Sequence, residues 1–184
     1  PGSALRVHGV GINPTRTGFL ALLERMGARI SHFKVRREGG EPVADLEVEA
    51  GELVAAEVRP EEVPTLIDEL PLFALVAGMA HGESVVRGAA ELRVKESDRI
   101  ETVKEALRPL GIRIETTHDG FRVRGVPTRP KGGGVVNAAG DHRIAMLAAI
   151  AGLVSREGVR IEGAEAVAVS FPDFFAMLDS LAVR

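Results

Sequence analysis

One pattern recurs three times along this chain. Strand-like runs at Leu5–Gly9, Val85–Gly88 and Val159–Gly163 each end in a glycine, and these glycines are 79 and 75 residues apart. Each run leads through a polar loop into a stretch whose apolar residues have helical spacing. A unit that recurs at such a period predicts similar units packed around a shared centre, so this repeat limits the possible folds more than any other feature.

The remaining parts of each unit follow from aligning the three copies. Amphipathic helices are expected at 19–26, 100–110 and 174–181, and strands after them at 27–30, 111–114 and 182–184. The first two units also carry an extra hairpin, around Gly39 and around Gly120, where glycine supplies the turn. Strands that alternate with helices in this way predict an α/β or α+β fold.

Two other helices are expected to be apolar on nearly every side. They cover residues 72–80 and 144–154, and each precedes one of the repeated strands. A helix that is apolar all round is buried, so these two should form the centre of the fold. The first unit should have an equivalent helix before residue 1, and the third should continue beyond residue 184. We therefore expect residues 1–184 to be one domain excised from a larger protein.

Composition narrows the classes of function. The net charge of −3 and the lack of a basic segment with interleaved aromatic residues argue against a nucleic-acid partner. The chain has no cysteine, and its five histidines do not have the spacing of metal ligands. No apolar run of about 18 residues and no signal peptide is found, which predicts a cytoplasmic protein without a membrane partner.

Charged side chains gather where the second repeated helix is expected to begin. Lys95, Glu96 and Arg99 lie between an apolar run, interpreted as a strand, and the helix. A helix start presents free N–H groups and the positive end of its dipole to an anion. The cluster is therefore either a site for phosphate or carboxylate or a solvated lattice of salt bridges.

A second helix start has the same construction. Asp141 is a plausible N-cap, and Arg143 lies in the first turn of the apolar helix at 144–154. A cation in the first turn opposes the helix dipole and therefore needs an explanation. Either an anion binds in front of Arg143, or Arg143 forms an interdomain salt bridge.

The ordered motifs resemble the 5-enolpyruvylshikimate-3-phosphate (EPSP) synthase family. The resemblance rests on Gly9–Arg16, Leu66–Pro71, Val94–Arg99, Asp141–Arg143 and Ser170–Pro172. It covers essentially the whole chain, but only the C-terminal half of such an enzyme. It implies a fold of two domains, each of three βαβαββ units, with substrates bound between them, so the N-terminal domain would be this chain's absent partner.

The resemblance also implies a reaction. The enolpyruvyl group of phosphoenolpyruvate is transferred to the 5-hydroxyl of shikimate-3-phosphate, and phosphate is released, as a step of the shikimate pathway to aromatic amino acids. No metal or organic cofactor is implied. Without the N-terminal domain, the chain alone is expected to be inactive.

Roles in proton transfer follow by resemblance. Asp68 resembles the general base that contacts shikimate-3-phosphate and takes the proton of its 5-hydroxyl. Glu96 resembles the carboxyl group that protonates the methylene carbon of phosphoenolpyruvate. His142 would orient Glu96 or act as a spacer. On its sequence position alone, Asp68 would be interpreted as a cap or turn residue.

Roles in binding follow in the same way. Lys95 resembles the lysine that contacts shikimate-3-phosphate. Arg99 and Arg143 resemble the pair that clamps the carboxylate of phosphoenolpyruvate, where the fork of a guanidinium suits two oxygens. The chain departs from some family members at Val169, where they have a lysine for the donor phosphate, and at Glu91, where they have an acceptor-binding asparagine.

Two alternatives stay open. A related enolpyruvyl transferase acts on UDP-N-acetylglucosamine, but it lacks the Lys-Glu-Ser-Asp-Arg signature of residues 95–99. A non-catalytic anion-binding module could use the same repeats. In the enzymatic interpretation, the site residues surround one concave, positively biased patch, and the two arginines are not closed on protein carboxylates. Arginines closed on such carboxylates would favour the salt-bridge interpretation.

Overall fold

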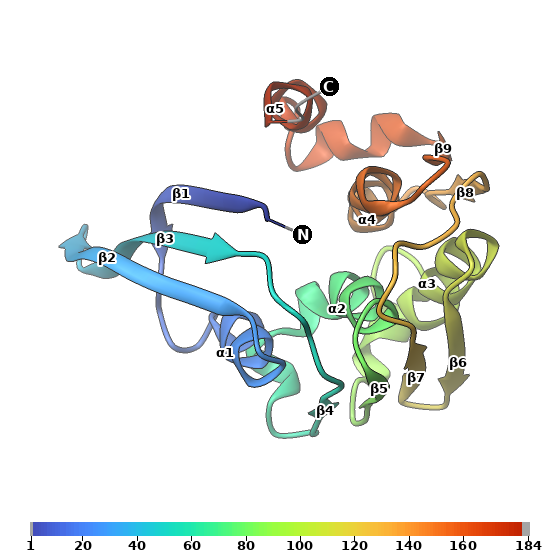
Figure 1. Cartoon of the computed structure of the whole chain (residues 1–184), viewed down its shortest axis with the longest axis horizontal. Helices are drawn as coiled ribbons and strands as arrows, with labels where there is room; N and C mark the ends of the chain where they lie inside the picture. The colour runs from blue at the N-terminus through green and yellow to red at the C-terminus, as the bar shows by residue number, and fades with distance from the viewer. Residues whose placement is uncertain (1, 182–184) are drawn as a thin grey trace.

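The computed structural model describes residues 2–181, and within them the strands form three sheets. The first unit consists of β1 (Ala4–Gly11), α1 (Gly18–Arg25), β2 (Arg29–Glu38) and β3 (Glu41–Glu49). Its strands are antiparallel in the order β1-β3-β2, with the expected hairpin turn at Gly39 and Gly40. Figure 1 shows this sheet extending to one side of the remaining helices.

The second unit has a complete βαβαββ order. It consists of β4 (Glu57–Val58), α2 (Leu70–Gly78), β5 (Gly82–Val86), α3 (Arg99–Leu107), β6 (Arg113–Thr117) and β7 (Gly120–Gly125). Strands β4 and β5 are parallel, whereas β7 is antiparallel to both β5 and β6. The hairpin expected around Gly120 is therefore confirmed, and the sheet order is β4-β5-β7-β6.

The third unit repeats the beginning of the second. It contains β8 (Val135–Asn137), α4 (His142–Val154), β9 (Arg160–Glu162) and α5 (Phe174–Leu181), and β8 is parallel to β9. The amphipathic helix expected at 174–181 is confirmed. The strand expected at 182–184 lies outside the described residues.

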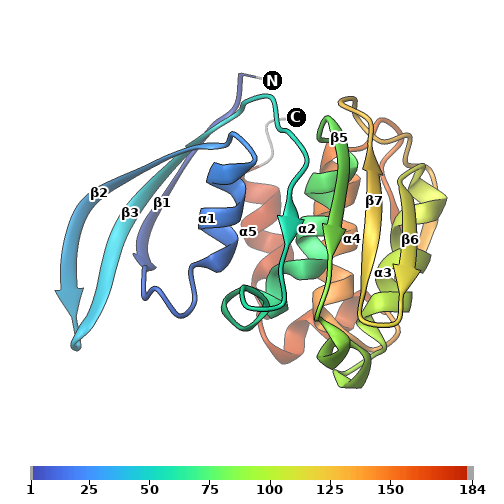
Figure 2. The same cartoon turned by 90° about the horizontal axis from the view of Figure 1, so that it is seen from below.

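The two apolar helices are buried, as their composition predicts. In α2 the buried side chains include Phe73 and Leu75, and in α4 they include Ile144 and Leu147. Each helix is the crossover between two parallel strands, so both helix starts lie toward the carboxyl ends of those strands, where α/β folds place ligands. Figure 2 shows α2, α4 and α3 behind the β5–β7–β6 face. One apolar cluster joins all three units.

Two local expectations need correction. The apolar run before Lys95 is a 3-10 helix, Ala90–Val94, and not a strand. Its entry is tied to the β6–β7 hairpin because Asp119 accepts hydrogen bonds from the backbone N–H groups of Gly88 and Ala89, and Leu92 is buried in the core.

The helix expected at 100–110 also ends early. Helix α3 stops at Leu107 and continues as a 3-10 turn over Arg108–Leu110. Pro109 explains the change, because proline has no N–H group and its ring crowds the preceding turn of an α-helix. Gly111 then reverses the chain with a left-handed backbone, φ 92°.

Candidate functional site

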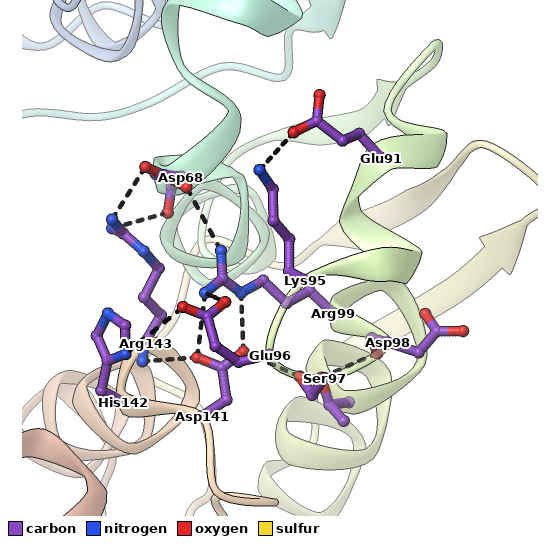
Figure 3. A network of polar contacts seen from close by, with 11 residues as sticks. Asp68, Glu91, Lys95, Glu96, Ser97, Asp98, Arg99, Asp141, His142 and Arg143 are labelled. Atoms are coloured by element: carbon purple, nitrogen blue, oxygen red, sulfur yellow. Dashed lines mark hydrogen bonds and ion pairs between the residues drawn. The ribbon is translucent and has the colours of Figure 1, made fainter. Parts of the chain in front are cut away.

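Three helix starts meet at one place, and they carry the residues that the sequence singled out (Figure 3). Asp68 lies in a 3-10 turn, Ile67–Glu69, directly before α2. Glu96 precedes α3, and Arg99 is its first residue. Arg143 lies in the first turn of α4. Ion pairs join the side chains of these four residues, so the expected convergence is confirmed for them. Lys95, the fifth expected member, pairs with Glu91 instead.

Arg99 is built into the core. Asp98 caps α3 by accepting a hydrogen bond from the Glu101 N–H group at 3.2 Å, which fixes where the helix begins. The Arg99 side chain is only 1% exposed. Its Nε donates to Oδ2 of Asp141 at 2.8 Å and its Nη2 donates to Oδ1 of Asp141 at 3.3 Å. A two-point contact of this kind holds the plane of the guanidinium in one orientation.

Asp141 is the fully buried partner that connects two helix starts. Besides binding Arg99, it caps α4 by accepting a hydrogen bond from the Arg143 N–H group at 2.9 Å. The hydroxyl of Ser97 also donates to Asp141, at 2.9 Å. Burial acts to raise the pKa of Asp141, but these hydrogen bonds and the charge of Arg99 outweigh it and lower the pKa.

Sequence reasoning identified Asp141 as a cap but missed its contact with Arg99. Ser97 was likewise missed, although it belongs to the same motif. A possible signal was the pairing of two helix starts that each combine an aspartate cap with an arginine. A buried arginine needs a carboxylate, and the cap of the neighbouring helix was the available one.

Asp68 bridges the two arginines. Its Oδ1 lies 3.4 Å from Nη1 of Arg99 and its Oδ2 lies 3.0 Å from Nη2 of Arg143. Nη1 of Arg143 also donates to the backbone carbonyl of Asp68 at 3.4 Å. Arg143 is 29% exposed and Asp68 is 24% exposed, so this side of the cluster is open to solvent.

Glu96 and His142 lie at the rim of the cluster. Glu96 is 48% exposed, and its Oε2 accepts a hydrogen bond from Nη2 of Arg99 at 2.5 Å. Nδ1 of His142 lies 4.0 Å from Oε1 of Glu96. The imidazole therefore lies beside Glu96, but too far away to form a hydrogen bond with it.

Lys95 faces a different partner. Its ammonium group pairs with Glu91, four residues earlier, and Figure 3 shows this contact beside the arginine cluster. Glu91 is the position at which some family members have an acceptor-binding asparagine. Its role in the structure is to neutralise Lys95. Val169, at the end of a 3-10 helix (Ala164–Val169), is 84% exposed and has no charge to offer.

Two expectations for this site were wrong: that its net charge is positive, and that its arginines are not paired with protein carboxylates. Lys95, Arg99 and Arg143 are matched by carboxylates from every adjoining segment: Asp68, Glu91, Glu96 and Asp141. The outcome that favours salt bridges is therefore the one observed, although the bridges form within this chain. Hollows of about 550 and 230 Å³ lie at the other end of α3, and none of the cluster residues lines them.

Two kinds of site are not found in the described residues. Across 2–181, no group of three or more histidine, aspartate or glutamate side chains is arranged to hold a metal ion. No helix in that range is long and apolar enough to cross a membrane.

Comparison with known proteins identifies the family of this cluster. Residues 1–178 match the sequence model of a family described as EPSP synthase (3-phosphoshikimate 1-carboxyvinyltransferase). The chain belongs to the EPSP synthase family. A 3-phosphoshikimate 1-carboxyvinyltransferase of Sulfurihydrogenibium sp. is 47% identical over 98% of this chain and 41% of the relative. One from Geobacillus kaustophilus is 47% identical over 98% of this chain and 42% of the relative.

Solved structures agree with this family and with the fold. An EPSP synthase from Acinetobacter baumannii superposes with a TM-score of 0.92 at 39% identity, over 97% of this chain and 42% of that chain. The enolpyruvyl transferase NikO from Streptomyces tendae has a TM-score of 0.75 at 23% identity, which supports the shared fold alone. The α/β fold of enolpyruvyl transferases is thus confirmed. The chain spans about two fifths of the length of these EPSP synthases.

Proposed function

We propose that this chain supplies one side of the active site of an EPSP synthase that has the length of its relatives. That enzyme would transfer the enolpyruvyl group of phosphoenolpyruvate to the 5-hydroxyl of shikimate-3-phosphate in the cytoplasmic shikimate pathway. The observation that carries the proposal is the convergence of Asp68, Glu96, Arg99 and Arg143 in a chain that matches the EPSP synthase family over residues 1–178. Within this cluster the Asp68 carboxylate spans Arg99 and Arg143. A pair of arginines that binds a protein carboxylate in this way has the geometry to bind the carboxylate of phosphoenolpyruvate.

The proposed chemistry moves two protons. Asp68 takes the proton of the acceptor's 5-hydroxyl while the oxygen of that hydroxyl attacks C2 of the donor. Glu96 gives a proton to the methylene carbon, so that negative charge does not accumulate there. Loss of phosphate from C2 and return of one methyl proton to the Glu96 carboxylate then regenerate the double bond. The positions of Asp68 and Glu96 on opposite sides of Arg99 support this division of roles.

The binding roles are proposed on the same grounds. Arg99 and Arg143 hold the donor carboxylate, and His142 orients Glu96. Lys95 contacts the acceptor once it exchanges Glu91 for a substrate oxygen. Because Val169 cannot bind phosphate, the donor phosphate must be held by other residues. No metal or organic cofactor takes part in this scheme.

We further propose that residues 1–184 are one domain and that a second, N-terminal domain completes the cleft. Closing a cleft excludes water and fixes two substrates together, effects that can lower a barrier by roughly 7–11 kcal/mol. One wall cannot do this. We therefore expect the chain alone to bind phosphoenolpyruvate weakly and to release phosphate at a negligible rate.

Two alternatives are less well supported. The curated relatives named above are 3-phosphoshikimate 1-carboxyvinyltransferases, which argues against UDP-N-acetylglucosamine as the acceptor. A non-catalytic anion-binding module would not need Asp68 and Glu96 on either side of the arginines. Presence of both carboxylates favours catalysis.

Phosphate release tests the proposal directly. The purified chain is mixed with phosphoenolpyruvate and shikimate-3-phosphate, first alone and then with the N-terminal part of a close relative added in trans. We expect release only in the second case, and loss of that release with Glu96→Gln. Rapid release by the chain alone would overturn the proposal of a shared site, and release unaffected by Glu96→Gln would overturn the proposed acid.

A further inference from the structure

The bridging carboxylate of Asp68 occupies the outward-facing donors of both arginines. On Arg99, Nε and Nη2 are engaged by Asp141, and Nη2 also binds Glu96. Only Nη1 remains, and it faces Asp68 at 3.4 Å. On Arg143, Nη2 faces the Asp68 carboxylate and Nη1 faces the Asp68 carbonyl. A ligand carboxylate that bridged the two guanidinium groups would need the positions that Asp68 now holds.

The three carboxylates around Arg99 differ in how easily they can leave. Asp141 is fully buried and holds a helix cap, a serine hydroxyl and Arg99 together, so it cannot be displaced without disturbing α4. Glu96 is half exposed but contacts only Arg99 of the two arginines. Within residues 2–181, Asp68 is the one carboxylate of the three that contacts both guanidinium groups.

Nothing else in the described residues holds the Asp68 carboxylate. Across 2–181, its two oxygens form ion pairs with the two arginines and accept no further hydrogen bond. The side chain is partly open to solvent and extends from a short 3-10 turn. It can therefore be released by rotation of the side chain, without loss of a cap or of core packing.

We propose that Asp68 and the donor carboxylate compete for Arg99 and Arg143, so that binding of the donor releases Asp68 to act as the base. This inference rests on the proposed function. While Asp68 is paired with the two arginines, each of its oxygens faces a guanidinium and neither is placed to receive the proton of a substrate hydroxyl. A donor carboxylate that takes over the arginines frees these oxygens. The base thus becomes active only when there is a donor for the deprotonated acceptor to attack.

The inference predicts that one substitution in the substrate site increases the affinity for the donor. Asp68→Asn removes the competing charge and should tighten the binding of phosphoenolpyruvate to this chain about five-fold, as measured by isothermal titration calorimetry. The matched control is Glu69→Gln, which removes a neighbouring carboxylate that forms no ion pair with either arginine within 2–181. It should change the affinity by less than about two-fold.

The outcomes separate this inference from the proposed function. Tighter binding by Asp68→Asn, together with lost phosphate release in the complemented enzyme, supports both. If the unaltered chain binds phosphoenolpyruvate and Asp68→Asn binds it equally well or more weakly, the competition is overturned but the proposed function is not. If neither protein binds phosphoenolpyruvate, the donor site itself is wrong and both proposals fail. A similar gain in affinity with Glu69→Gln would show that the loss of any nearby negative charge tightens binding, and this too would overturn the competition.

Discussion

The starts of α3 and α4 are built from the same parts but use them differently. Each has an aspartate cap and an arginine within its first turn. Arg99 points into the molecule and is almost completely buried, whereas Arg143 keeps nearly a third of its side chain in solvent. The difference arises because Asp141 turns toward Arg99, while Asp98 turns toward its own helix and toward Arg93.

This difference separates two functions of arginine in one cluster. Arg99 joins helices α3 and α4 through Asp141, so its contribution includes the stability of the fold. Within residues 2–181, the Arg143 guanidinium forms polar contacts only with the open carboxylate of Asp68 and the carbonyl behind it, so its contribution is to binding. Substitutions at the two helix starts should therefore affect different measurements.

The largest effect is expected from Arg99→Ala. It leaves Asp141 buried without its cation and opens a cavity, so the free energy of unfolding should fall by about 3–5 kcal/mol. Urea unfolding followed by far-ultraviolet circular dichroism measures this loss. A loss below about 1 kcal/mol would show that Arg99 contributes no more to the stability of the fold than Arg143 does.

Asp141→Asn should have the next largest effect, about 2–3 kcal/mol, because asparagine retains the cap but not the charge that pairs with Arg99. The same variant should also change how the free energy of unfolding depends on pH. The pKa of Asp141 is lowered in the folded chain, so its stabilisation is complete above the ordinary value of 3.8 and is lost as the pH falls below that value. Unfolding of Asp141→Asn should therefore depend less steeply on pH in this acidic range than unfolding of the unaltered chain.

Ser97→Ala tests the hydrogen bond that supports Asp141 from the α3 side. Removing one donor from a buried carboxylate should cost about 1 kcal/mol of stability. Thr102 is a matched control, because its hydroxyl contacts Ser97 and the Asp98 carbonyl but not Asp141. Equal losses for Ser97→Ala and Thr102→Val in thermal unfolding would contradict a specific role for the Ser97–Asp141 contact.

Arg143→Gln should have the smallest effect on stability, about 0–1 kcal/mol, since its ion pair with Asp68 is partly solvated. It should nevertheless weaken the binding of phosphoenolpyruvate more than ten-fold, because one arm of the proposed clamp is lost. Calorimetric titration and urea unfolding of the same variant provide the comparison. A large loss of stability without a loss of affinity would reverse the contrast between the two helix starts.

Much of the fold could be predicted from the sequence because local patterns determine it. Apolar residues mark α2 and α4, and the glycine turns at Gly39 and Gly120 mark the hairpins. The 3-10 helix at Ala90–Val94 could not be predicted in this way. Its conformation depends on the tie to Asp119, a tertiary contact that no local pattern specifies.

The sequence predicted that Asp68, Glu96, Arg99 and Arg143 lie together. It did not predict that Asp141 and Ser97 join them, or that the charges balance. The helix starts indicated Arg99 and Arg143 because a cation is unfavourable there without an anion. The anions themselves come from distant positions: Asp68 lies 31 residues before Arg99, and Asp141 lies 42 residues after it. Only the packing of the repeats brings these groups together, so the sequence could not predict the neutralised cluster.

The crossovers through α2 and α4 also determine how the chain opens. Along the chain, each of these helices connects two parallel strands that are hydrogen-bonded to each other, and its side chains belong to the common apolar cluster. Neither helix can therefore separate without disrupting the strand pair that it connects. Their amide protons should exchange with solvent only through global unfolding. The β1–β3–β2 sheet is different, since the residues of β1 and β2 are exposed at almost every position. Its amides should exchange through smaller openings at lower free energy, while the helix starts that carry the arginines stay in place.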